Sequence, residues 1–193
     1  MSARSALNDL IAGNARFVAG TSLCRPDVAQ VRSLVGGQSP FATVLACADS
    51  RVPVETLFDH HPGDIFVVRL AGNFVSEAAL ASIEYATAVL KSPLIMVLGH
   101  TSCGAVQAAV DFVKTGSELP GHMQLLATAI APAAEASMHR PGDWWYNAVV
   151  ENVRLSVATL RTSAPLMTQA LLDGHEIVGA VYDLANGQVS LLP

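Results

Sequence analysis

The stretch from Leu94 to Gly104, read as LIMVLGHTSCG, constrains the fold and the chemistry of this chain more than any other. Its apolar, partly β-branched run predicts a buried strand that ends at His100. The residues that follow are typical of a turn into a helix. An imidazole and the thiol of Cys103 therefore stand three residues apart at the carboxyl end of a predicted strand. Both groups are common ligands of zinc.

A second stretch has the same form. The residues from Phe41 to Cys47, FATVLAC, are an apolar run that stops at a cysteine. In open α/β sheets, ligand-binding groups gather beyond the carboxyl ends of parallel strands. The two stretches together therefore offer Cys47, His100 and Cys103 to one metal ion.

The rest of the chain alternates predicted strands with predicted helices. Helical spacing over residues 4–19 and 25–35 precedes the first strand. Further helices are predicted over 53–58, 76–90, 103–114, 144–160 and 165–172, with one or two helical pieces between 115 and 142, and further strands over 65–69, 176–182 and 188–192. The pair Asn186-Gly187 predicts a hairpin between the last two strands. This order predicts the α/β class, with an open, mostly parallel sheet flanked by helices and an antiparallel strand at one edge.

Composition limits the organisation and the partners of the chain. With 193 residues, of which 51% are hydrophobic, we expect one domain over 1–193, with an amino-terminal helical arm over 1–35 and an α/β core over 36–193. Charged residues make up only 14%, below the usual level of about 25%. A monomer would have too few charged side chains to cover its apolar surface, so we expect a homo-oligomer with a sizeable interface. The net charge of −5 includes no basic cluster, so a nucleic-acid partner is not expected. No GxGxxG or GxxxxGK[ST] motif supports nucleotide binding.

The expected location is the cytoplasm, without a membrane partner. No stretch reaches the roughly 18 to 20 apolar residues that a membrane span needs. The amino-terminal residues have no continuous apolar run typical of a secretory signal. The three cysteines, an odd number, fit a reducing compartment where thiols serve metals or chemistry.

The motifs CADSR at 47–51 and HTSCG at 100–104 resemble those of the β-class carbonic anhydrase family. The resemblance extends over roughly the whole chain, through GQSP, PGDIFVVRLAGN, SIEYA and VGAVYDL. It implies a zinc-dependent lyase that interconverts carbon dioxide and water with bicarbonate and a proton. It also implies a sheet of four parallel strands plus an antiparallel edge strand, and a homodimer or homotetramer whose amino-terminal helices pack on the neighbouring subunit.

The donor set suits zinc on chemical grounds. Two thiolates and one imidazole fit a tetrahedral Zn²⁺, one per subunit, and leave the fourth position for water. We hypothesise that Arg51 holds the Asp49 carboxylate in a charge-assisted pair, and that the carboxylate accepts a hydrogen bond from zinc-bound hydroxide and so orients it toward carbon dioxide. If that pair opened, Asp49 could bind zinc as the fourth ligand, a closed form that the family contains.

The resemblance also implies a substrate pocket. Gln38, Phe66 and Tyr85 match family positions that line it, and Gly104 matches a position whose backbone amide faces the site. Gln38 would donate to a bicarbonate oxygen, and the two aromatic rings would form apolar walls. The alternative for Phe66 and Tyr85 is a role as plain core residues.

The sequence is also compatible with two other functions. The first is a related zinc hydrolase that acts on carbonyl sulfide or carbon disulfide with the same ligands. The second is a non-catalytic structural zinc or redox module, in which Cys47 and Cys103 pair as a disulfide. A closed structural site would need a fourth permanent ligand, and Cys24 is the only spare cysteine.

Overall fold

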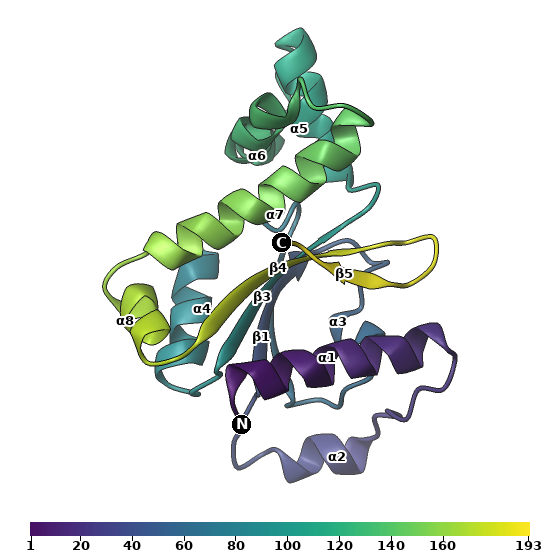
Figure 1. Cartoon of the computed structure of the whole chain (residues 1–193), viewed down its shortest axis with the longest axis vertical. Coiled ribbons are helices and arrows are strands. Elements are labelled where there is room, and N and C mark those ends of the chain that lie inside the picture. Colours follow the sequence, from purple (N-terminus) through teal and green to yellow (C-terminus); the bar gives the residue numbers. More distant parts are fainter.

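A computed structural model describes the whole chain, residues 1–193. Five strands form one open sheet in the order β2-β1-β3-β4-β5 (Figure 1). They are β1 (Ala42–Cys47), β2 (Ile65–Leu70), β3 (Leu94–His100), β4 (Glu176–Tyr182) and β5 (Val189–Leu191). The first four are parallel, and β5 pairs antiparallel with β4 at the edge. This architecture confirms the predicted fold class.

Eight helices accompany the sheet. They are α1 (Ala3–Val18), α2 (Val28–Ser33), α3 (Val54–Leu57), α4 (Glu77–Ala88), α5 (Gly104–Thr115), α6 (Met123–Ser137), α7 (Trp144–Thr162) and α8 (Leu166–Leu172). The helix predicted over 25–35 is shorter in the structure because Asp27 and Gln30 form a capping box that starts it at Val28. The segment 115–142 holds one helix, α6, which continues through Pro132. No helix has the length and apolar character needed to cross a membrane.

The two faces of the sheet bury separate cores, because alternate side chains of a strand point to opposite faces. Leu45, Ile95 and Val97 belong to the core under α4, α5, α6, α7 and α8. Their neighbours Val44 and Met96 belong to the core under α1 and α3. The strands β1 and β3 are buried along their whole length, which explains their continuous apolar sequences.

Helix α7 lies across the sheet and continues past it toward α5 and α6, which project at the top of Figure 1. Two glycines of the sheet let α7 approach closely. A Cβ at Gly99 would lie 2.6 Å from Cγ2 of Val153, and one at Gly179 would lie 2.8 Å from Cγ1 of the same valine. Small residues in β3 and β4 thus set the distance between α7 and the sheet.

The amino-terminal helix α1 packs against its own chain through one buried asparagine. Asn14 Nδ2 donates to the carbonyls of Leu57 and Gly187, and its Oδ1 accepts from the amide of Val189. Because a buried amide is costly unless it is fully hydrogen-bonded, this residue fixes α1 against α3 and the β4–β5 hairpin.

Candidate metal centre

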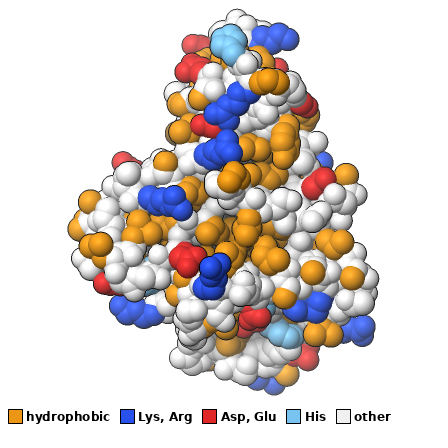
Figure 2. All heavy atoms as spheres, viewed as in Figure 1, with side chains coloured by type: hydrophobic (Ala, Val, Ile, Leu, Met, Phe, Trp, Pro, Cys, Tyr) orange, Lys and Arg blue, Asp and Glu red, His pale blue; other side chains and the backbone are white.

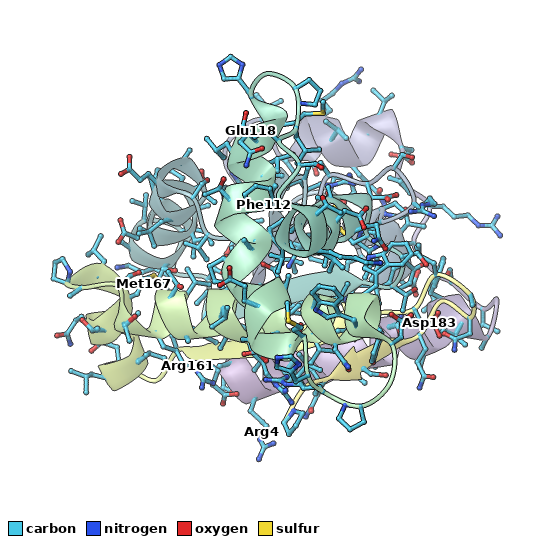
Figure 3. All side chains as sticks on the ribbon, turned by 90° about the horizontal axis from the view of Figure 1, so that it is seen from above. Arg4, Phe112, Glu118, Arg161, Met167 and Asp183 are labelled. Atoms are coloured by element: carbon cyan, nitrogen blue, oxygen red, sulfur yellow. The ribbon has the colours of Figure 1, made fainter.

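The structure brings Cys47, His100 and Cys103 together. Their ligand atoms all lie within 4.8 Å of one another, and all three residues are buried. Cys47 and His100 end β1 and β3, two adjacent parallel strands whose carboxyl ends lie at the same edge of the sheet. Cys103 is the residue that precedes α5. Figure 3 labels Asp183, which follows the carboxyl end of β4, and Met167 in α8, which precedes the amino end of β4.

The spacing of the two sulfurs fits a metal ion rather than a disulfide. The Sγ atoms of Cys47 and Cys103 are 3.9 Å apart, and both cysteines are free. A disulfide bond needs about 2.05 Å. Two sulfurs at about 2.3 Å from a tetrahedral zinc would be separated by about 3.8 Å. The distance therefore matches two ligands of one ion.

The thiols of Cys47 and Cys103 perturb each other's pKa across the contact between their sulfurs. A hydrogen bond from Cys103 lowers the pKa of Cys47 to about 4, although burial opposes this shift. The hydrogen bond to Cys47 and burial both raise the pKa of Cys103. Metal binding requires both thiols in the ionised form, so a cation bound between the two sulfurs would replace the remaining thiol proton.

His100 presents one free nitrogen to the same space. Its Nδ1 lies 2.9 Å from the backbone carbonyl of Thr101, which only accepts, so this nitrogen carries the proton. The Nε2 atom is buried and has no hydrogen-bond partner. Buried polar atoms are rarely left unpaired, and a metal ion would satisfy this lone pair. The donor set and its geometry therefore fit zinc.

Asp49 and Arg51 form a bidentate pair beside this group. Arg51 donates from Nε to Oδ1 at 2.9 Å and from Nη2 to Oδ2 at 2.7 Å. These side-chain hydrogen bonds are the main reason why the pKa of Asp49 lies well below its usual range. The Oδ2 atom is 3.9 Å from His100 Nε2. The carboxylate is thus ionised, faces the arginine and lies next to the three ligand atoms without joining them.

Two side chains that no sequence motif indicated, those of Arg69 and Trp145, donate hydrogen bonds to backbone carbonyls at and beside the Cys-His-Cys group. Arg69 donates to the carbonyls of Cys47 at 3.0 Å and Asp49 at 2.6 Å. Trp145 Nε1 donates to the carbonyl of Cys103 at 2.9 Å. No signal in the sequence could have identified these bonds, because every residue type offers the same carbonyl.

Three of the predicted pocket residues lie away from this group within one chain. Gln38 is exposed and precedes β1. Phe66 pairs with Thr43 near the amino end of the sheet, four positions and about 13 Å along β2 from the Leu70 that pairs with Cys47. Tyr85 is 49% exposed, and its ring centroid is 6.3 Å from that of Phe66.

Gly104 and Cys24 complete the set of predicted residues. Gly104 directly follows Cys103 and is the first residue of α5, so its backbone amide is beside the group of Cys47, His100 and Cys103. Cys24 lies elsewhere. Its Sγ is 2.9 Å from the carbonyl oxygen of His60 and 3.3 Å from Nδ1 of His61. The structure thus contains neither the disulfide nor the fourth cysteine ligand on which the non-catalytic alternative depended.

Fold and site together define a class: an open α/β protein with a Cys-His-Cys group, suited to zinc, at the carboxyl edge of its sheet. Comparison with known proteins gives the family. The carbonic anhydrase family model matches residues 42–189. Carbonic anhydrase of Mycolicibacterium smegmatis is 42% identical over 93% of this chain and 88% of its own. Carbonic anhydrase 2 of Mycobacterium tuberculosis is 40% identical over 93% and 87%.

Comparison with solved structures indicates the same family as these relatives. A tetrameric β-carbonic anhydrase of Sordaria macrospora superposes with a TM-score of 0.75 at 28% identity, covering 84% of this chain and 85% of its own. The chain belongs to the β-carbonic anhydrase family, whose enzymatic class is that of carbonate dehydratase, a lyase.

Proposed function

We propose that this protein catalyses the zinc-dependent, reversible hydration of carbon dioxide to bicarbonate and a proton. The observation that carries the proposal is the buried group of Cys47, His100 and Cys103, with an unpaired His100 Nε2 beside an ionised carboxylate. These three residues would hold one zinc ion per subunit. Bound there, zinc would supply Lewis-acid chemistry that makes water nucleophilic near neutral pH.

Asp49 would orient the attacking water. An ionised carboxylate only accepts hydrogen bonds, so water near Asp49 directs a proton at the carboxylate and a lone pair elsewhere. Arg51 fixes the carboxylate through two parallel bonds, and Arg69 fixes the backbone of Asp49. The carboxylate is therefore positioned before the substrate arrives, which reduces the entropic cost of reaching the transition state.

The rate of carbon dioxide hydration tests this function. We expect the zinc-loaded protein to accelerate hydration in a stopped-flow assay with a pH indicator, and a strong chelator to remove both zinc and activity. A protein that holds one zinc per chain without accelerating hydration would contradict the proposal. Faster turnover of carbonyl sulfide or carbon disulfide than of carbon dioxide would favour the related hydrolase instead.

We also propose that a homo-oligomer, a dimer or a tetramer, completes the substrate pocket. The chain carries exposed apolar side chains, and Figure 2 shows hydrophobic side chains gathered near the centre of one face. Within one chain, Phe66 lies about 13 Å along β2 from the level of Cys47, with Tyr85 beside it, and Gln38 precedes the amino end of β1. We propose that a neighbouring subunit supplies these three residues to the pocket. The backbone amide of Gly104 would come from the same chain as the metal ligands.

Replacing Phe66 with alanine tests the pocket. We expect kcat/KM for carbon dioxide to fall roughly tenfold, equivalent to about 1.4 kcal/mol, because an apolar wall is lost while the metal ligands stay in place. Zinc content should not change. Phe112→Ala is the matched control, since Phe112 is a partly exposed phenylalanine on α5 (Figure 3). Equal activity of the two variants would contradict the pocket role.

The proposed location is the cytoplasm. All three cysteines are free in the structure, and two of them serve the proposed metal site as thiolates. A reducing compartment keeps such thiols available for the metal. Recovery of the protein from a secreted fraction of its host would contradict this location.

A further inference from the structure

One face of α7 bonds to the loops that surround the metal ligands. Trp145 donates to the carbonyl of Cys103 at 2.9 Å, and Asn152 Nδ2 donates to the carbonyl of Gly72 at 2.7 Å. Residues seven positions apart lie on the same face of a helix. The buried side of α7 also packs on Gly99 and Gly179 of the sheet through Val153. This packing fixes α7 relative to the sheet, and so fixes the two hydrogen-bond donors.

The segment that Asn152 contacts is a tight turn after β2. The amide of Asn73 donates to the carbonyl of Leu70 at 3.2 Å, and Gly72 has a φ of +83°. A hydrogen bond across four residues with a positive φ at the third is typical of a type II turn, which favours glycine there. A Cβ at Gly72 would also lie 2.4 Å from Cδ1 of Ile130.

This turn supplies a hydrogen bond to one of the metal ligands. The amide of Gly72 donates to Cys47 Sγ at 3.3 Å. A donor to a thiolate stabilises the negative charge on sulfur and tunes how strongly the sulfur donates to a metal. The bond depends on the orientation of Gly72, and glycine is the residue with the greatest freedom to change that orientation.

We propose that Asn152 is a positioning residue for the metal centre. It anchors the carbonyl of Gly72 from one side, while Cys47 Sγ accepts from the amide on the other side, so both peptide groups of Gly72 are restrained. Asn152 is 4% exposed, and burial prevents water from replacing its amide. The proposal rests on the zinc centre proposed above and assigns to α7 a role in setting the affinity of that centre.

Asn152→Leu tests the proposal, because leucine keeps the branch at Cγ and cannot donate a hydrogen bond to Gly72. We expect zinc affinity, measured by competition with a chromogenic chelator, to fall by roughly 10- to 100-fold. In the Co²⁺-substituted protein, the thiolate-to-metal charge-transfer band should move to lower energy, since a sulfur without its donor releases electrons more readily.

Asn147→Leu is the matched control. Asn147 is also on α7 and also donates to backbone carbonyls, those of Arg140 and Pro141, away from the metal ligands. This variant should lose some stability and keep both the affinity and the charge-transfer band of the unchanged protein. Equal losses of zinc affinity in the two variants would overturn the proposal, because they would show a general effect of weakening α7.

A measurement on the unchanged protein keeps the proposal testable if Asn152→Leu does not fold. With ¹¹³Cd in place of zinc, we expect a scalar coupling between the metal and the amide proton of Gly72, transmitted through Cys47 Sγ. Absence of this coupling in a protein that binds cadmium would overturn the inference alone. A protein that takes up neither cadmium, cobalt nor zinc would instead overturn the proposed function.

Discussion

Cys47→Ser is expected to remove zinc and to lower the rate of carbon dioxide hydration by at least about a thousandfold, equivalent to about 4 kcal/mol. A serine hydroxyl does not ionise near neutral pH, so the site would lose one of its two anionic ligands. The remaining Cys103 and His100 would have to hold the ion alone. Zinc content after dialysis, measured by atomic emission, and the stopped-flow hydration rate check the two effects separately.

Cys24→Ser is the matched control for this prediction. The thiol of Cys24 contacts the carbonyl of His60 and the ring of His61, and it is not part of the ligand group. We expect one zinc per chain and an unchanged hydration rate. Retention of zinc by Cys47→Ser, or loss of zinc from Cys24→Ser, would show that the metal binds elsewhere.

Asp49→Asn is expected to keep zinc and to lower the hydration rate by about a hundredfold or more, the cost typical of a misplaced reacting group. Asparagine can turn its amide donor toward the water, and it loses the charge that pairs with Arg51. Because Arg51 holds the pKa of Asp49 below its usual range, the carboxylate stays ionised above about pH 4. Its contribution is therefore present at neutral pH and is lost only in strong acid.

The pH profile tests whether Asp49 stays ionised over the working range of the enzyme. In the unchanged protein we expect no fall in activity between pH 8 and 5 that tracks titration of Asp49, since protonation of a group with a lowered pKa needs a lower pH.

Asp111→Asn is the matched control for Asp49→Asn, because it removes the same charge from an exposed aspartate on α5 that accepts from Gln107. An unchanged rate in zinc-loaded Asp49→Asn would remove Asp49 from the mechanism.

Much of the fold follows from local patterns. The apolar runs of β1 and β3 identify strands buried on both faces, and the helix predicted over 76–90 is α4, which Ser76 caps at its start. The parallel order follows from the alternation of strands and helices. The start of α2 and the continuity of α6 were harder to predict, because local capping and packing decide where a helix begins and whether a proline interrupts it. The division into an arm over 1–35 and a core over 36–193 stays a prediction.

The ligand group was predictable for a different reason. Cys47 and His100 end strands that the α/β pattern places side by side, so their proximity follows from topology. The distance of Phe66 from that group was not predictable, because it depends on strand register. The position of Tyr85 depends on how α4 packs beside Phe66. The role of Asn152 was equally hidden, since its partner is a backbone carbonyl and carries no signature in the sequence.

The amino-acid sequence by itself determined the kinds of element, the order of strands and helices, and the donor types that suit zinc. These properties depend on side-chain chemistry and on short-range periodicity, which a linear chain displays directly. The tertiary structure decided which lone pair stays unpaired, which carboxylate faces an arginine and which helix restrains the Gly72 turn. Those properties depend on distances of a few ångströms between residues far apart in the chain, and only the packed fold sets such distances.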